Sequence, residues 1–330
     1  MAESAAKLAA RVRAGDRAAL ARAITLIESA RPDDQAGAEH LLDVLAPGIG
    51  NAWRIGVSGV PGVGKSTFID ALGCWLVEQG HRVAVLAVDP SSTLSGGSIM
   101  GDKTQMARLA RLDEAFIRPT PSARTLGGVA ARTREGMMLC EAAGYDVVLV
   151  ETVGVGQSET VVADMVDCFL VLMLPGAGDE LQGIKKGILE IADIVAVNKA
   201  DGDNIGRARE AVTEYGAALR YGRAEPSAWR RQATMTSAVT GEGIAEIWAL
   251  IEEHRATLDG SGELEERRRR QRLGWMWGFV EDSLIHDFRA RATASGEAAA
   301  TEQALLAGEV TPRRAARQLM ARLAGEPDSH

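Results

Sequence analysis

The segment from Gly59 to Ser66 reads Gly-Val-Pro-Gly-Val-Gly-Lys-Ser, and it constrains the fold more than any other part of the chain. Two glycines five residues apart, followed by lysine and a hydroxyl residue, form a loop whose backbone N–H groups wrap around phosphates. The apolar run Ile55–Ser58 precedes the loop and a helical pattern over 67–77 follows it, which is the strand–loop–helix setting that such a loop needs. The sequence therefore predicts a nucleotide triphosphate site here.

The residues expected to surround the phosphates share this loop and the start of the following helix. They are Gly59, Val60, Pro61, Gly62, Val63, Gly64, Lys65, Ser66 and Thr67. The Lys65 ammonium is expected to reach the β- and γ-phosphates, so it is also a candidate for the reaction itself. The Ser66 hydroxyl is expected to bind Mg²⁺. A glycine-rich turn that merely precedes Lys-Ser is the alternative interpretation.

A second motif, Asn198-Lys199-Ala200-Asp201, follows the apolar run Asp193–Val197. The Asp201 carboxylate can accept hydrogen bonds from N1–H and the 2-amino group of guanine, whereas adenine has no donor at either place. The end of a later strand is expected to add backbone contacts to the base through Ser237, Ala238 and Val239. An ordinary polar loop is the alternative for the tetrapeptide alone. After a phosphate loop, in this order, guanine recognition is the better interpretation.

Short apolar runs alternate with helical stretches through the middle of the chain, and the clearest of them have little polar alternation. Strands buried on both faces belong to parallel sheets covered by helices, so the pattern predicts a doubly wound, mostly parallel α/β domain. The expected strands are Trp53–Ser58, Arg82–Val88, Ala115–Arg118, Asp146–Glu151, Cys168–Leu174, Asp193–Asn198 and Ala233–Ser237. Helices are expected at 65–79, 102–112, 125–143, 159–166, 180–191, 204–220 and 242–256.

Two of these strands lead into an acidic residue, Asp89 and Glu151. Parallel strands deliver their carboxyl ends to the ligand crevice, so either carboxylate can hold the Mg²⁺ shell. The N–H of Gly154, three residues after Glu151, can meet the γ-phosphate. Carboxylates that are simply solvated at strand ends are the alternative.

Helical extensions are expected on both sides of this domain. Apolar residues at three- and four-residue steps predict helices over 4–46, and beyond about 257 the strands stop. Thr311 and Pro312 predict the start of the last helix, and Thr293–Ala300 is expected to be the loosest segment. We therefore expect three parts: residues 1–50, a nucleotide domain over 51–256, and a helical dimerisation region over 257–330.

The C-terminal part carries an apolar row and a cationic run. The row consists of Leu273, Trp277, Val280, Leu284 and Phe288, with Trp275 beside it, and fits either an interface helix or a helix packed on its own domain. The run is Arg267–Arg270. Because glutamates at 263, 265 and 266 stand four residues before arginines at 267, 269 and 270, an exposed, salt-bridged face is the expected arrangement.

The composition excludes several classes of partner. A formal net charge of −8 argues against nucleic acid, which needs a basic surface. Cys74, Cys140 and Cys168 lie in apolar runs without a CxxC, which predicts buried thiols in a reducing compartment, and the five histidines have no metal-ligand spacing. No apolar run reaches the ~18 residues of a membrane span, so no membrane partner is expected and the cytoplasm is the expected compartment.

Six segments occur in an order that resembles the MeaB/ArgK/MMAA group of P-loop GTPases over nearly the whole chain: GVPGVGKST, VDPSS, GDKTQM, ETVGVGQSE, PGAGDELQGIKKG and NKAD. The resemblance implies a GTPase that acts as a chaperone of adenosylcobalamin-dependent methylmalonyl-CoA mutase. In that group GTP hydrolysis is coupled to cofactor loading and to protection or reactivation of the mutase. The resemblance also implies a homodimer joined through the C-terminal helices.

The same resemblance assigns Mg²⁺ and switch roles to Asp89, Asp102 and Glu151. It makes 92–103 the first switch, 154–159 the second, and 178–186 a third that contacts the mutase. Gln182 and Lys185 would be the polar residues of that third switch. In Ras-type enzymes a glutamine directly follows the switch glycine, whereas here Val155 does and Gln157 comes later. Slow intrinsic turnover that a partner raises is therefore expected.

Three other functions are compatible with parts of the sequence. A GTPase metallochaperone for nickel-enzyme maturation would share the fold, but it needs His- or Cys-rich segments, which this chain lacks. A kinase or ATP-dependent transport enzyme is disfavoured by the guanine-reading motif. A nucleotide-gated scaffold without meaningful hydrolysis stays open at this point.

Overall fold

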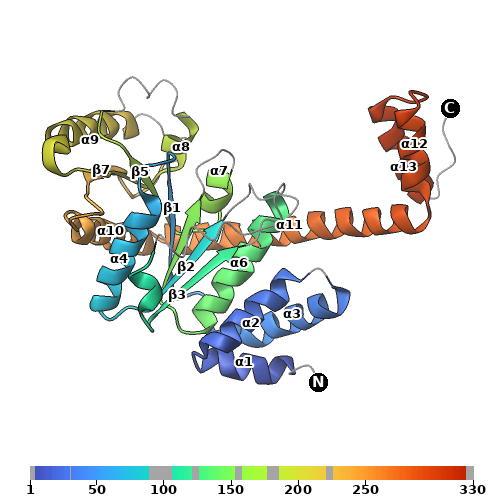
Figure 1. The fold of residues 1–330 in the computed structure, drawn as a ribbon, viewed down its shortest axis with the longest axis horizontal. Coiled ribbons are helices and arrows are strands. Elements are labelled where there is room, and N and C mark those ends of the chain that lie inside the picture. Colours follow the sequence, from blue (N-terminus) through green and yellow to red (C-terminus); the bar gives the residue numbers. More distant parts are fainter. Residues whose placement is uncertain are drawn as a thin grey trace. The chain divides into compact units, whose positions relative to one another are not determined.

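The computed structural model describes residues 4–29, 31–88, 106–120, 126–152, 158–176, 186–220 and 226–324 (Figure 1). Its strands are β1 (Trp53–Gly59), β2 (Val83–Val88), β3 (Ala115–Thr120), β4 (Val147–Thr152), β5 (Cys168–Met173), β6 (Ile194–Val197) and β7 (Gln232–Met235). Its α-helices are α1 (Ala5–Arg13), α2 (Arg17–Glu28), α3 (Pro32–Leu45), α4 (Lys65–Glu78), α6 (Leu126–Ala142), α7 (Ser158–Ala163), α8 (Lys186–Ile191), α9 (Ile205–Leu219), α10 (Ile244–Ser261), α11 (Glu263–Ala294), α12 (Glu297–Leu306) and α13 (Pro312–Ala324).

The described strands form one seven-stranded sheet in the order β3-β2-β4-β1-β5-β6-β7, and every neighbouring pair is parallel. All seven predicted strands are present, and the doubly wound α/β class is confirmed. Strands β2, β4, β5 and β6 are buried along their whole length, as continuous apolar runs require when helices cover both faces of a sheet. All carboxyl ends therefore meet at one edge of the sheet and all amino ends at the opposite edge.

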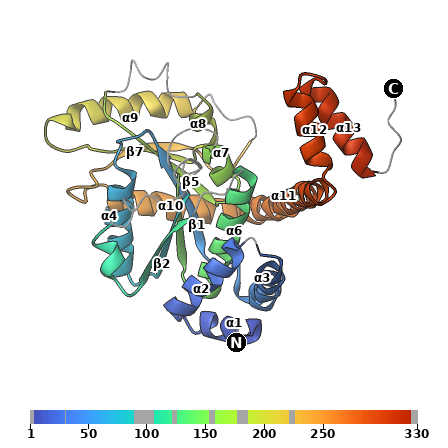
Figure 2. The ribbon, with the colours of Figure 1, turned by 45° about the vertical axis from the view of Figure 1, so that its right-hand side comes forward.

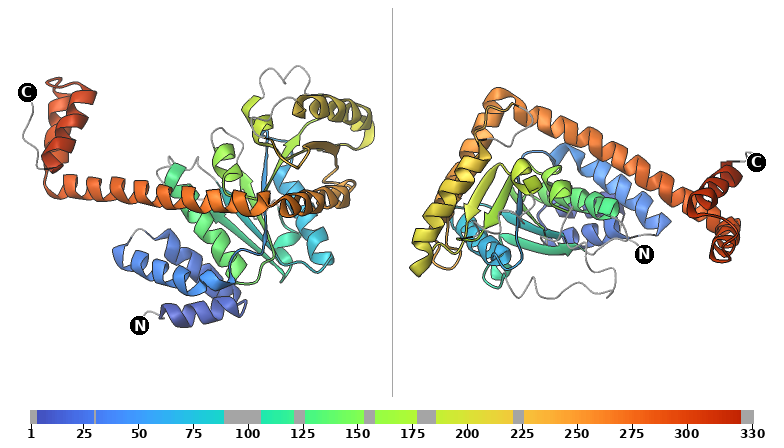
Figure 3. Two further views of the ribbon diagram at one scale, coloured as in Figure 1. Left: turned by 180° about the vertical axis from the view of Figure 1, so that it is seen from behind. Right: turned by 90° about the horizontal axis from the view of Figure 1, so that it is seen from above.

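Helices cover both faces of the sheet (Figure 3). On one face α4 contacts α10, and a core there joins Val57 and Leu149 from the strands with Leu72 from α4 and Trp248 from α10. On the other face α6, α7, α8 and α9 follow one another in contact across the sheet. This layering brings the carboxyl ends of β1, β4 and β6 to the same edge of the sheet, where a ligand crevice is expected.

The three N-terminal helices α1, α2 and α3 pack on one another and on α6 (Figure 2). Asp16 starts α2, because its carboxylate accepts hydrogen bonds from the backbone N–H groups of Ala18 and Ala19 at 2.9 and 3.0 Å. The Arg11 guanidinium also binds this carboxylate, which holds the end of α1 beside the start of α2. The predicted N-terminal helices are confirmed.

Two predictions about local structure are wrong. The expected helix over 102–112 is not formed in its described part, where 109–111 make one turn of 3₁₀-helix. The Asp70 carboxylate accepts hydrogen bonds from the backbone N–H groups of Arg108 and Leu109, so these groups do not make the internal hydrogen bonds that the predicted helix would need from them. The segment Thr293–Ala300 is also not a loop, because all of it except 295–296 lies in α11 or α12. Gly296, at a φ of 76°, merely separates the end of α11 from the start of α12.

The chain divides into two compact units, Met1–Gln271 and Arg272–His330. The second contains the end of α11 with α12 and α13, which pack against each other. The three-part division expected from the sequence stays a prediction. Among the described helices, none combines the length and the apolar character that crossing a membrane requires. Cys140 and Cys168 are buried as predicted, and Cys74 is half-buried.

Candidate nucleotide-binding site

The loop after β1 is shaped by glycines that no other residue could replace without strain. A Cβ on Gly59 would lie 2.4 Å from the Leu172 carbonyl oxygen, because β5 runs close beside the loop. Gly64 precedes α4 with a φ of 94°, and a Cβ there would lie 3.0 Å from the Asn198 amide nitrogen. These close approaches require glycine at both positions, and the loop leads directly into the start of α4, where a helix N-terminus favours phosphate.

The Lys65 side chain folds back over this loop. Its Nζ donates hydrogen bonds to the carbonyl oxygens of Gly59 at 2.9 Å and of Val60 at 3.4 Å. Partial burial lowers the pKa of Lys65, while the negative charges of Glu151 and Glu159 act in the opposite direction. The ammonium thus has neutral backbone acceptors and two nearby carboxylates, an arrangement that a phosphate oxygen can enter.

Ser66 and Glu151 come together from different elements. The Ser66 hydroxyl, at the start of α4, donates to Glu151 Oε1 at 3.0 Å, and Glu151 lies at the end of β4. Hydroxyl and carboxylate oxygens are the ligands that Mg²⁺ prefers, so this pair fits the ion. The other predicted residues of this region, Asp89, Asp102 and Gly154, lie outside the described residues, as do Gln182 and Lys185.

The base-reading motif is tied directly to the phosphate loop. The buried Asn198 amide donates to the Val63 carbonyl oxygen at 2.8 Å and accepts a hydrogen bond from the Ala238 N–H at 3.1 Å. Lys199, at a φ of 60°, donates from Nζ to the Gly62 carbonyl oxygen at 2.8 Å. The three segments that the sequence assigned to one nucleotide therefore lie side by side.

The Asp201 carboxylate has a partner that sequence reasoning missed. Ser237 Oγ donates to Asp201 Oδ2 at 2.5 Å and accepts a hydrogen bond from the Thr240 N–H at 3.2 Å. A fully buried hydroxyl thus orients the carboxylate that is expected to read guanine, while Val239 projects into solvent. A sequence signal exists, since Ser237 belongs to the second base-contacting segment, but that motif predicts only backbone contacts.

Two further features lie near the phosphate loop, and the sequence pattern assigned a side-chain role to neither of them, although Glu159 ends the predicted second switch. Glu159, in the first turn of α7, is a buried carboxylate whose charge acts on Lys65. Thr152 Oγ1 donates to Ser58 Oγ at 2.8 Å, and both residues are fully buried between β4 and β1. A serine or threonine inside an apolar run gives no periodic signal, so its partner cannot be read from the sequence.

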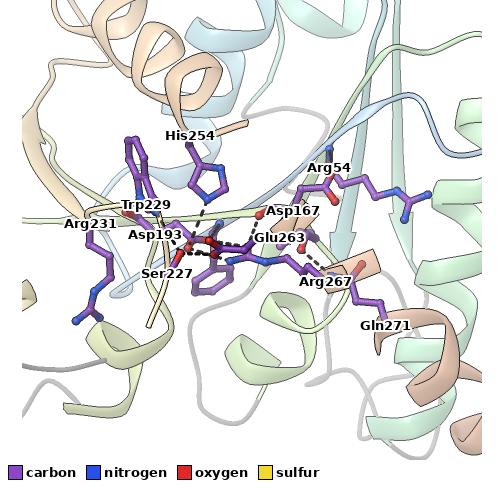
Figure 4. A network of polar contacts seen from close by, with 12 residues as sticks. Arg54, Asp167, Asp193, Ser227, Trp229, Arg231, His254, Glu263, Arg267 and Gln271 are labelled. Atoms are coloured by element: carbon purple, nitrogen blue, oxygen red, sulfur yellow. Dashed lines mark hydrogen bonds and ion pairs between the residues drawn. The ribbon is translucent and has the colours of Figure 1, made fainter. Parts of the chain in front are cut away.

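The opposite edge of the sheet holds a closed network of ion pairs (Figure 4). The buried Asp193 carboxylate accepts hydrogen bonds from Arg267 at 3.1 and 3.4 Å and from the Phe169 N–H at 3.0 Å. Asp167 meets Arg268 in two hydrogen bonds of 2.9 and 2.6 Å. These contacts fasten the start of α11 to the amino ends of β5 and β6.

The predicted exposed face of Arg267–Arg270 is therefore wrong for its first two members. Arg267 and Arg268 turn inward to distant carboxylates, whereas the exposed Arg269 pairs with Glu266 at 3.4 Å. A signal for the buried side existed, since Leu264, Arg268, Gln271 and Trp275 recur at helical spacing and all are buried. The glutamates four residues before these arginines favour salt bridges within the helix, and this local pattern predicts an exposed face instead.

Cys168, Asp193 and His254 offer three possible metal ligands within 4.8 Å of one another in this network. However, the Arg267 guanidinium already balances the Asp193 carboxylate, and burial raises the pKa of the Cys168 thiol well above its ordinary value. A divalent ion with a thiolate would leave one excess positive charge in a buried site, which is costly. We interpret the cluster as structural.

Comparison with known proteins agrees with this geometry. A family model described as methylmalonyl Co-A mutase-associated GTPase MeaB matches residues 20–293. A probable GTPase of Mycobacterium tuberculosis is 55% identical over 313 residues, which cover 95% of this chain and 93% of that protein. The GTPase ArgK of Escherichia coli is 48% identical over 309 residues, covering 94% and 93%.

An animal relative and a solved structure extend the comparison. The mitochondrial methylmalonic aciduria type A homolog of Mus musculus is 47% identical over 316 residues, covering 93% of this chain and 76% of that protein. A crystal structure described as LAO/AO transport system kinase superposes with a TM-score of 0.75 at 42% identity, covering 98% of this chain and 99% of that one. The P-loop nucleotide-binding fold is confirmed. The individual site residues stay predictions.

Proposed function

Because the chain belongs to the MeaB family of P-loop GTPases, we propose that it is a chaperone of an adenosylcobalamin-dependent methylmalonyl-CoA mutase and acts in the cytoplasm. Hydrolysis of GTP would gate cofactor loading and protect or reactivate the mutase. The observation that supports this most is the family match over 20–293, whose description names association with that mutase. The name of the mouse relative, methylmalonic aciduria type A homolog, points to the same metabolism.

The phosphate half of the site would work by charge and position. GTP would present its β- and γ-phosphates to the N–H groups between Gly59 and Thr67, and the Lys65 ammonium would exchange its carbonyl acceptors for phosphate oxygens. Ser66 and Glu151 would hold Mg²⁺, with Asp89 and Asp102 as further candidates for its shell. When bound, the ion would neutralise charge that develops on the phosphate oxygens.

The guanine half of the site would select GTP by discriminating against adenine. Asp201, held by Ser237, would accept two hydrogen bonds from guanine, and adenine would leave this carboxylate without donors. Asn198 would transmit the position of the base-reading loop to the phosphate loop, because its amide bridges Val63 and Ala238. No glutamine directly follows Gly154, so unaided turnover is expected to be slow and the mutase to raise it. Gln182 and Lys185 are the proposed contacts to the mutase.

We also propose that the protein forms a homodimer whose two chains contact each other through α11. Within the single chain, this helix leaves Leu273, Trp277 and Leu284 exposed by 54, 61 and 64%, at the spacing of one helix stripe. Such a row of large apolar side chains is typical of an interface rather than of a solvated helix. Leu284→Asp is expected to give a monomer in light scattering, while His286→Asp, on the opposite side of the helix, leaves the dimer intact. A dimer that survives Leu284→Asp would contradict this arrangement.

The decisive experiment is GTP turnover by the purified chain, alone and with methylmalonyl-CoA mutase. We expect the mutase to accelerate turnover by about tenfold or more, since partner-supplied groups raise GTPase rates strongly. The Lys65→Ala variant with the same mutase controls for contaminating phosphatase. No acceleration, together with no complex on a sizing column, would reject the chaperone role. Stoichiometric Ni²⁺ binding in the same preparation would support the metallochaperone alternative instead.

A further inference from the structure

A buried pair of hydroxyl groups joins the two central strands directly beneath the phosphate loop. Thr152 Oγ1 donates to Ser58 Oγ at 2.8 Å, and neither residue has any exposed surface. Ser58 immediately precedes Gly59, where the phosphate loop begins, and Thr152 immediately follows Glu151. The hydrogen bond therefore connects two strand residues, one next to the phosphate loop and one next to Glu151. These two neighbouring segments are expected to bind opposite sides of the nucleotide.

The backbone pairing shows why a link is needed at this level. Pairs between β1 and β4 run from Trp53 with Val147 to Val57 with Glu151. One residue further on, Ser58 pairs with Val171 of β5, while Thr152 pairs with Val88 of β2. The backbone pairing between β1 and β4 thus ends just below the Ser58–Thr152 level, while β1 stays paired with β5 and β4 with β2, and the ligand crevice is expected above this level. At that level the side-chain hydrogen bond spans the gap.

Burying two hydroxyl groups costs more free energy than filling the same space with apolar side chains. A buried hydroxyl must be hydrogen-bonded, and replacing both partners by apolar groups of similar shape can be nearly neutral for stability. The partners across β5 and β2 at the same level, Val171 and Val88, are apolar. Packing alone therefore does not require polar groups here, whereas a directional bond between two strand ends fixes their separation.

We propose that Ser58 and Thr152 are positioning residues for GTP hydrolysis, which hold Glu151 at a fixed distance from Ser66 and Lys65. Glu151 Oε1 lies 3.0 Å from the Ser66 hydroxyl, so a small shift of β4 against β1 breaks this contact. Neither Ser58 nor Thr152 contacts the nucleotide in this assignment. Their effect passes through the carboxylate next to Thr152 and the loop next to Ser58. Binding of the base, which depends on β6, is expected to be spared.

The test is a double-mutant cycle with Thr152→Val, Ser58→Ala and the combined variant. We expect kcat for GTP to fall about tenfold in each variant, with the Mg²⁺ concentration for half-maximal rate raised and KM for GTP changed less than about threefold. The combined variant should be no slower than the single ones, because each single substitution already removes the hydrogen bond between the two side chains. Thr152→Ser keeps a hydroxyl and should restore kcat to within about twofold of the original chain.

Thr213→Val controls for the chemical change, because Thr213 on α9 is exposed and its hydroxyl bonds only within its own helix, to the Arg209 carbonyl oxygen. A merely structural role would lower the melting temperature without moving the Mg²⁺ dependence. Strictly additive effects of the two single substitutions on kcat would overturn the proposal. So would an unchanged kcat in the combined variant. If that variant does not fold, equal kcat values for Thr152→Ser and Thr152→Val reject the proposal.

Discussion

At the carboxyl ends of its strands the sheet carries two lysines, Lys65 and Lys199, whose ammonium groups hydrogen-bond to backbone carbonyls. At the amino ends, three arginines each meet a buried carboxylate: Arg54 meets Glu141, Arg267 meets Asp193 and Arg268 meets Asp167. Neutral acceptors can be exchanged for a ligand at little cost, whereas separating a buried ion pair leaves a charge without compensation. The kind of partner thus distinguishes the two sets of cations. A lysine bonded to neutral carbonyl oxygens remains available to bind a ligand, whereas an arginine paired with a buried carboxylate stabilises the fold.

The largest expected effect is on stability, at the amino-end network. Arg267→Met would leave the Asp193 carboxylate buried without its cation, so we expect the free energy of unfolding to fall by about 3–5 kcal/mol. Arg269→Met is the matched control, because that arginine is 67% exposed and its pair should be worth less than about 1 kcal/mol. Denaturant unfolding measures both. Equal losses in the two variants would remove the distinction between inward and outward arginines.

Lys65→Ala should produce the converse result. Loss of charge-assisted hydrogen bonds to the phosphates is expected to weaken GTP binding by about 100-fold, while the free energy of unfolding changes by less than about 1 kcal/mol. Titration with a fluorescent GTP analogue gives the affinity, and unfolding of the nucleotide-free protein gives the stability. Loss of stability as large as in Arg267→Met would mean that Lys65 is a structural residue and would break the comparison between the two edges.

The two edges also differ in how much the sequence reveals. The strands and the phosphate loop were predictable because continuous apolar runs and a fixed glycine spacing are local signals. The partners of Arg267 and Arg268 were not, because Asp193 and Asp167 lie 74 and 101 positions away while glutamates lie one helical turn away. The turn at 109–111 was missed for the same reason, since it depends on Asp70 of α4. Local pattern predicts elements, but it does not choose among distant partners.

Asp201→Asn tests whether the carboxyl-end edge also contains the specificity. An amide would offer guanine one acceptor in place of a carboxylate, so the preference for GTP over ATP should fall by about 10- to 50-fold. The fold should be unaffected, because the hydrogen bond from Ser237 can still reach the amide oxygen. Competition between GTP and ATP for the site measures the ratio. A full preference for GTP in this variant would reject the assignment of the base-reading loop, and preference for ATP in the original chain would favour a kinase or ATP-dependent transport enzyme.

The smallest expected effect is the acid sensitivity of the amino-end network. Burial alone would raise the pKa of Asp193, but the Arg267 charge and the His254 imidazole, whose Nε2 lies 3.5 Å from Oδ1, outweigh it and hold this pKa below its ordinary value. A carboxyl whose pKa is lower in the folded state stabilises the fold above its unfolded pKa of about 4, and this contribution is lost as pH falls toward the folded pKa. We therefore expect the original chain to lose about 1 kcal/mol more than Asp193→Asn between pH 5 and pH 3. Urea unfolding at several pH values compares the two proteins, and GTP affinity at neutral pH should not follow the same difference. Parallel stability curves would mean that Asp193 is not the anion that Arg267 requires, and the pairing at the amino ends would need another explanation.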